Sequence, residues 1–274
     1  MNRLSDFNSL DTLPEPLKGL WTESTLKGRK RQERYPHHRF FGIWCSYFPE
    51  EIVLAAGLEP LRLFPAHSGT TPAELPPFCC SLARGILDMA VRGEFNDLVG
   101  VGFAHTCDTM QGLSGIWVES LQIPTVNLVP PVTLTNQGAA RYYQAELRDG
   151  WQKLQELSGR KATGTDLLKA LELCRSYRRL AAEIDELRPM LPSALTAAIL
   201  RAGQLMPRSQ YVAALGEILP MLRQMAAPDE ARARVLLSGA VLENDSLYSL
   251  LEQLGGRVVA DDTCTGFRHY ADNF

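Results

Sequence analysis

Apolar and polar positions form alternating blocks along the first half of the chain. Short apolar runs of strand length are separated by longer stretches in which apolar residues recur every three or four positions. This pattern predicts strands at 41–45, 60–64, 98–103 and 124–129, and helices at 49–57, 78–92 and 107–121. Strands that alternate with helices in this way are typical of βαβ units, so the pattern predicts a mostly parallel sheet.

The middle of the chain changes character. From about 133 to 225 strand signals are nearly absent, and one stripe of apolar positions at helical spacing runs from Leu167 to Leu180. Cys174 lies within that stripe, so we interpret it as a core residue. Prolines are predicted to divide the rest of this stretch into separate helices; they are Pro189, Pro192, Pro207 and Pro220.

A second α/β pattern closes the sequence, with strands predicted at 234–239 and 256–260 around a helix at 245–254. The fold class is therefore α/β: a parallel-sheet N-terminal domain at 38–132, a helical bridge at 133–228, and the start of a second parallel-sheet domain at 229–274. A parallel sheet of two strands cannot cover both of its faces, so we expect this second domain to be incomplete and the chain to be truncated.

Composition excludes several classes of protein. The 274 residues are 45% hydrophobic and 22% charged, with a net charge of −3, which argues against a nucleic-acid-binding protein. The basic run at 27–38 is better explained as a solvated helix face than as a site for an anionic partner. There is no apolar run of the length of a membrane span and no secretory signal pattern, so we expect a cytoplasmic protein. The six cysteines then favour thiols or metal ligands over disulfides.

Two cysteines are predicted to reach the same edge of the first sheet. Cys80 precedes one predicted helix, and Cys107 begins the helix that follows the strand at 98–103. Ligands of open α/β sheets bind at the carboxyl ends of the strands, so both thiols are candidate metal ligands. Their spacing does not resemble the compact arrays of zinc fingers or ferredoxins, and core packing of free thiols remains the alternative on spacing alone.

The sequence around these cysteines adds an ordered series of short motifs. It begins with Gly-Ile-Trp-Cys-Ser-Tyr-Phe-Pro-Glu-Glu at 42–51 and continues with Cys-Ser-Leu-Ala-Arg at 80–84, Thr-Cys-Asp at 106–108 and Asp-Asp-Thr-Cys-Thr-Gly at 261–266. This series resembles the 2-hydroxyacyl-CoA dehydratase D-component family, which also contains benzoyl-CoA reductase subunits. The resemblance covers about residues 38–270.

The resemblance implies a 4Fe-4S cluster held by three cysteines, of which Cys80 and Cys107 match the first two. The third family cysteine is expected beyond Phe274, and Cys264 is a less favoured substitute. The implied activity is dehydration of an acyl-CoA through a ketyl radical, started by one electron from an ATP-dependent iron–sulfur activator protein. A paralogous second subunit is the other implied partner.

Glu51 matches the family's Pro-Glu-Glu segment and is the candidate acid–base or substrate-positioning residue. A charge in the first helical turn without catalytic importance is an equally good account of it. We interpret Glu50 as the solvent-facing member of the pair. Cys45 is assigned to the pocket wall or, preferentially, to the core, and Asp108 to a helix cap or the surroundings of the cluster.

Three other functions stay open. The chain could be a non-catalytic pairing or regulatory subunit of the same fold, a benzoyl-CoA reductase-type subunit, or a zinc or redox-thiol protein. The sequence does not identify the acyl-CoA, nor does it separate dehydration from ring reduction.

Overall fold

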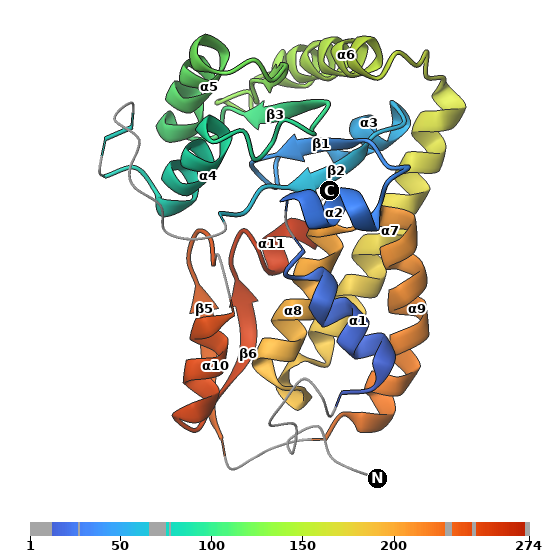
Figure 1. Ribbon diagram of the computed structural model, residues 1–274, viewed down its shortest axis with the longest axis vertical. Helices are drawn as coiled ribbons and strands as arrows, with labels where there is room; N and C mark the ends of the chain where they lie inside the picture. The colour runs from blue at the N-terminus through green and yellow to red at the C-terminus, as the bar shows by residue number, and fades with distance from the viewer. Residues whose placement is uncertain are drawn as a thin grey trace. The chain divides into compact units, whose positions relative to one another are not determined.

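The computed structural model describes residues 13–26, 28–65, 75–76, 78–227, 232–242 and 245–271. The chain separates into two compact units (Figure 1). The continuous unit comprises residues 27–172, and the discontinuous unit joins residues 1–26 to residues 173–274. The three-domain division expected from the sequence is a different partition and stays a prediction.

The continuous unit is built around a four-stranded parallel sheet with strand order β2-β1-β3-β4. The predicted α/β class is thereby confirmed, and the predicted strands and helices are present with ends shifted by one to three residues. In chain order the elements are α2 (Gly28–Arg34), β1 (Phe40–Ile43), α3 (Glu50–Ala55), β2 (Glu59–Arg62), α4 (Ser81–Val91), β3 (Gly100–Ala104), α5 (Asp108–Ser120), β4 (Thr125–Leu128), α6 (Ala139–Ser158) and the start of α7 (Gly164–Glu186).

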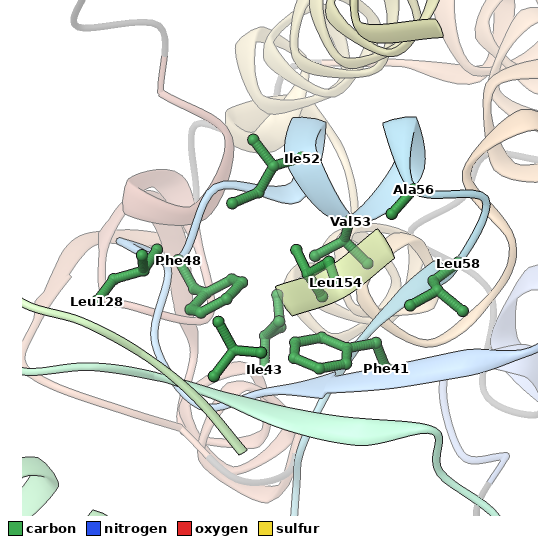
Figure 2. Packing of buried hydrophobic residues seen from close by; sticks show 10 residues of the cluster. Phe41, Ile43, Phe48, Ile52, Val53, Ala56, Leu58, Leu128 and Leu154 are labelled. Atoms are coloured by element: carbon green, nitrogen blue, oxygen red, sulfur yellow. The ribbon is translucent and has the colours of Figure 1, made fainter. Parts of the chain in front are cut away.

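One face of this sheet packs against α3 and α6. Figure 2 shows Phe41 and Ile43 of β1 together with Val53 of α3 and Leu154 of α6, and none of these four side chains is exposed. Fully burying an apolar side chain of this size stabilises a fold by about 1.5–3 kcal/mol. The alternation of side chains along β1 sends its other residues to the opposite face of the sheet.

That opposite face is covered by α5 through an aromatic cluster. Trp44, directly after β1, stacks on Phe103 of β3 with ring centroids 5.3 Å apart. Trp117 of α5 meets both rings edge-on, at 5.5 and 5.8 Å. Edge-to-face and offset pairs at these distances suit the quadrupoles of aromatic rings. The sheet is therefore buried on both faces, as the apolar runs of its strands predict.

The discontinuous unit combines helices with a small parallel sheet. Its elements are α1 (Glu15–Glu23), the rest of α7, the 3-10 helix η3 (Arg188–Met190), α8 (Ser193–Leu205), α9 (Arg208–Met225), β5 (Ala233–Ser238), α10 (Ser246–Gln253), β6 (Gly256–Asp262) and α11 (Phe267–Tyr270). The second sheet contains β5 and β6. The side chains of β5 are exposed or half-buried, and that of Leu236 is 63% exposed.

A buried charge cluster lies in the discontinuous unit. The Arg188 side chain is fully buried; its Nε donates to Asp185 Oδ1 at 2.6 Å, and its Nη1 lies 3.7 Å from Asp261 Oδ2. The hydroxyl of Tyr248 donates to Asp261 at 2.5 Å, and that of Tyr270 donates to Asp185 at 3.0 Å. A buried cation needs such partners because its desolvation is costly.

One expectation from the sequence was wrong. Pro220 does not end a helix but lies inside α9, at an exposed position. By contrast, Pro192 and Pro207 directly precede α8 and α9, as expected. Most described residues of the basic run are exposed, in agreement with a solvated helix face; Arg31 is the exception among its basic residues, because its side chain is buried and its Nη2 bonds Asp97 Oδ2 at 2.5 Å.

Candidate functional site at the carboxyl edge of the four-stranded sheet

The carboxyl ends of β1, β2, β3 and β4 lie at one edge of the sheet because all four strands are parallel. The segment after β1 leads to Glu51 in the first turn of α3, and the segment after β3 leads to Cys107 at the start of α5. Helix α4 connects the carboxyl end of β2 to the amino end of β3, so it begins on the carboxyl side. Cys80 is its N-cap residue, so the fold directs all three candidate residues to this edge.

Cys80 and Cys107 hold equivalent local positions. Each is the N-cap residue of its helix, each is exposed, and neither helix has a side-chain cap bond at this end. Helices α4 and α5 also pack against each other. Accessible thiols at the N-termini of two adjacent helices suit an anionic metal–sulfur group, because the amides of the first turn and the helix dipole favour negative charge.

Of the other four cysteines, Cys264 follows β6 in the discontinuous unit and is half-buried, and the other three lie in the core or near the carboxyl edge. Cys174 is fully buried, which confirms the core assignment, and Cys79 is buried as well. Cys45 is only half-buried, and its Sγ lies 3.5 Å from the hydroxyl Oγ1 of Thr106, the residue before Cys107. The preferred core assignment of Cys45 was therefore wrong, because this thiol follows the buried end of β1 and reaches the segment that carries Cys107.

Both carboxylates of the Pro-Glu-Glu segment are buried. Glu50 is 5% exposed and Glu51 is 9% exposed, so the expectation that Glu50 faces solvent was wrong. The short helix α3 that carries both residues packs against α6. A buried carboxylate at the carboxyl edge is better suited to acid–base or binding work than a solvated first-turn charge.

Helix α6 brings two further polar side chains to this edge. Glu146 accepts a hydrogen bond at 2.9 Å from the backbone amide of Val129, the residue directly after β4. Tyr143 is half-buried one turn earlier on the helix. Burial raises the pKa of Tyr143, and the negative charges of Glu51 and Glu146 raise this pKa further. Neither residue was found from the sequence, since α6 lies in the stretch interpreted only as helical.

Hydrogen bonds join the segment after β1 to the end of β2, and the segment after β3 to helix α5. Arg62, at the end of β2, is 2% exposed, and its Nη1 donates to Ser46 Oγ at 3.0 Å. His105 Nε2 lies 3.0 Å from Ser114 Oγ, and the Ser114 hydroxyl donates to the carbonyl of Gln111. The single hydroxyl proton of Ser114 is then committed, so His105 is the donor of their shared bond through a protonated Nε2.

The donor set fits part of an iron–sulfur site. Cys80 and Cys107 supply two accessible thiols at one sheet edge, the residue type that holds such clusters. Within the described ranges, no group of three or more Cys, His, Asp or Glu side chains is arranged to hold a metal ion. The two thiols are thus of the residue type and exposure that suit ligands of such a cluster.

The chain is similar in sequence to subunits of several enzymes that act on coenzyme A thioesters. It is 22% identical over 238 residues to the (R)-phenyllactyl-CoA dehydratase beta subunit of Clostridium sporogenes. The aligned region covers 84% of this chain and 63% of the relative. Identity to a benzoyl-CoA reductase subunit of Thauera aromatica is 25%, with 85% and 63% covered. Identity to the beta subunit of (R)-2-hydroxyglutaryl-CoA dehydratase of Acidaminococcus fermentans is 23%, with 84% and 63% covered.

The chain thus spans a little under two thirds of the length of these relatives. The sequence model of the family described as 2-hydroxyglutaryl-CoA dehydratase, D-component, matches residues 45–274, which include the Pro-Glu-Glu segment, both candidate cysteines and the Asp-Asp-Thr-Cys segment. The chain belongs to the 2-hydroxyglutaryl-CoA dehydratase D-component family.

Proposed function

We propose that this chain is the iron–sulfur subunit of a 2-hydroxyacyl-CoA dehydratase-type lyase, which removes water from an acyl-CoA. The observation that carries the proposal is the pair Cys80 and Cys107, two exposed thiols at the N-termini of adjacent helices on the carboxyl edge of one parallel sheet. The family of the chain and the dehydratase names of its relatives support the same activity.

Cys80 and Cys107 would hold two corners of a 4Fe-4S cluster in this proposal. Such a cluster, when bound, supplies one low-potential electron for reduction of the thioester carbonyl to a ketyl radical. An ATP-dependent iron–sulfur activator would deliver that electron, and a paralogous second subunit would complete the enzyme. The helix N-termini at both cysteines would stabilise negative charge at the edge.

Glu51 would act on the substrate itself. Its carboxylate is buried beside the edge, so it can accept a proton from a substrate carbon or oxygen and return it without exchange with bulk water. General acid–base catalysis of this kind contributes about 10²–10⁴-fold to a rate. Arg62, Ser46 and Thr106 are the polar side chains that would keep the neighbouring loops in place.

The test is anaerobic dehydration of a 2-hydroxyacyl-CoA by the chain combined with its second subunit, the activator, ATP and a reductant. We expect an enoyl-CoA product, and we expect E51Q to lower the rate about 10²–10⁴-fold while the exposed-site control E156Q retains it. Full activity in E51Q would refute the role of Glu51. Unchanged substrate in every wild-type reaction would refute dehydration.

A second candidate function is a non-catalytic pairing subunit of the same fold. It is favoured by the lack of a three-ligand group among the residues that the structure describes. The two candidates differ in one measurement, because a purely pairing subunit would not need bound iron. A benzoyl-CoA reductase-type role is favoured only by the relative from Thauera aromatica, and a test with benzoyl-CoA in the same assay separates it.

A further inference from the structure

One face of α6 runs from the hydrophobic core to the carboxyl edge of the sheet. Leu154 lies fully buried in the core, and Gly150 lies so close to β4 that an added Cβ would be 2.7 Å from Leu128 Cδ2 and 3.7 Å from Ile52 Cδ1. Residues three, four and seven positions apart share a helix face. Glu146 and Tyr143, four and seven residues before Gly150, therefore lie on the same face of the helix, nearer to its N-terminus.

The hydrogen bond from the Val129 amide to Glu146 fixes this turn of α6 at the end of β4. Helix α3, which begins with Glu50 and Glu51, packs against α6 in the same unit. Tyr143 therefore lies on a helix that two independent contacts hold at the carboxyl edge. One contact is to the residue after β4 and the other is to α3.

Tyr143 and Glu51 have complementary hydrogen-bonding chemistry. The half-buried phenol retains its proton beside two negative charges and is a donor, whereas the buried carboxylate of Glu51 is an acceptor. A hydroxyl group is the smallest ligand that uses both, since it accepts one hydrogen bond and donates another. The carboxylate of Glu146 is held in place by the hydrogen bond from the Val129 amide.

We propose that Tyr143 and Glu51 form a donor–acceptor pair that positions the hydroxyl group of a 2-hydroxyacyl thioester, with Tyr143 as a specificity-determining residue. This inference rests on the proposed function. An acyl group without the hydroxyl cannot form these two hydrogen bonds to the phenol and the carboxylate, so it binds less tightly. The pair thus selects hydroxyacyl substrates over their deoxy analogues and over acyl groups without a hydroxyl, such as benzoyl.

The proximity of the pair is tested without substrate by NMR of the protein carrying tyrosine labelled with ¹³C at Cζ. The signal that disappears in Y143F identifies Tyr143. Its titration midpoint in E51Q should move to lower pH, because removal of the neighbouring negative charge makes the phenol easier to ionise. The control E156Q, an exposed position on the same helix, should leave the midpoint in place. An unmoved midpoint in E51Q would overturn the pair.

Specificity is tested by calorimetry on the chain combined with its second subunit, with two matched ligand pairs: lactoyl-CoA with propionyl-CoA, and phenyllactyl-CoA with phenylpropionyl-CoA. We expect the wild-type chain to bind the hydroxylated member of at least one pair about tenfold more tightly. Y143F should abolish this preference and leave the affinity for the deoxy compound unchanged. Y142F, which removes the hydroxyl of the adjacent exposed tyrosine, should retain it.

Each result has a distinct meaning. A preference that persists in Y143F, or an equal weakening of both members of a pair, overturns the role of Tyr143 and leaves the proposed function intact. If none of the four compounds binds the wild-type chain combined with its second subunit, the proposed function fails, and this inference fails with it.

Discussion

The absence of a single Cβ atom allows two segments near the carboxyl edge to approach each other closely. Gly102, in the middle of β3, faces Phe48, the side chain that fills the space between the sheet and α3. A Cβ added at Gly102 would lie 2.5 Å from Phe48 Cε2, which is closer than packed carbon atoms can approach. Glycine at this position therefore lets the segment between β1 and Glu51 close onto the sheet.

Gly102→Ala should destabilise the chain by about 1–3 kcal/mol, because Phe48 is 1% exposed and has little space into which to move. Urea unfolding at equilibrium measures this change. The matched control is G112A in the exposed part of α5, where no atom lies within 4 Å of the added Cβ and helix propensity favours alanine by roughly 0.5–1 kcal/mol. Equal stability of the two variants would contradict the packing described for Gly102.

At the scale of elements, strands and helices could be predicted because their patterns are local. The apolar runs of β1, β3 and β4 are typical of strands buried on both faces, and Pro49 and Gly57 bound α3 as expected. Gly57 has φ +78°, a backbone conformation that suits glycine at a helix end. Pro220 was misjudged because a proline on a solvated helix face costs less than one in a buried turn.

The start of α7 is stabilised by a reciprocal cap. The Asp166 amide donates to Thr163 Oγ1 at 3.3 Å, and the Thr163 amide and hydroxyl donate to Asp166 Oδ2 at 2.8 and 2.6 Å. These bonds from Thr163 lower the pKa of Asp166. Because the pKa of this carboxyl group is lower in the folded state, the group stabilises the cap at pH values above its unfolded-state pKa of about 3.9. The stabilisation is lost as the pH falls through the folded-state pKa.

Hydrogen exchange of the first-turn amides of α7 should therefore accelerate, relative to the intrinsic rate, as the pH falls below about 4. In D166N the protection of these amides should be weaker at neutral pH and should not change across this acidic range. Glu172, on the same helix, provides the control variant E172Q, which should behave like the wild type. Protection that is independent of pH in the wild-type chain would contradict the role of Asp166.

At the scale of the whole molecule, the two compact units differ in how much of their organisation the sequence reveals. Cys80, Cys107 and Glu51 could be placed at one edge from strand order and motifs. Tyr143 and Glu146 could not, because their relation to that edge depends on the packing of α6 against α3 and β4. The cluster around Arg188 could not be predicted either, since Tyr248, Asp261 and Tyr270 are distant in sequence from Asp185 and Arg188.

Arg188→Met should destabilise the discontinuous unit by roughly 3–5 kcal/mol, because Asp185 and Asp261 would lose their buried cation. Chemical unfolding followed by circular dichroism measures the loss. R179M is the control: Arg179 forms an exposed pair with Glu183 on α7, and such a pair contributes about 0–1 kcal/mol. An R188M variant as stable as R179M would show that the buried cluster contributes little.

The continuous unit should fold when expressed as residues 27–172, since its sheet and both covering helix layers lie within that range. Trp44 and Trp117 lie in its aromatic cluster and report on tertiary packing. We expect a near-ultraviolet circular dichroism signal that is lost in one cooperative transition on heating. A fragment with helical content but without this signal would show that the unit depends on the rest of the chain.

The central claim is that Cys80 and Cys107 bind one iron–sulfur cluster. The most direct test is the iron and sulfide content of the chain after anaerobic reconstitution with excess small thiol, which can complete the coordination of a cluster held by two protein cysteines. We expect the wild type to bind iron and sulfide with broad visible absorption, C80A and C107A each to lose both, and C174A, in which a buried core thiol is removed, to retain them. A wild-type chain without bound iron, or variants C80A and C107A that keep the full iron content, would contradict the account.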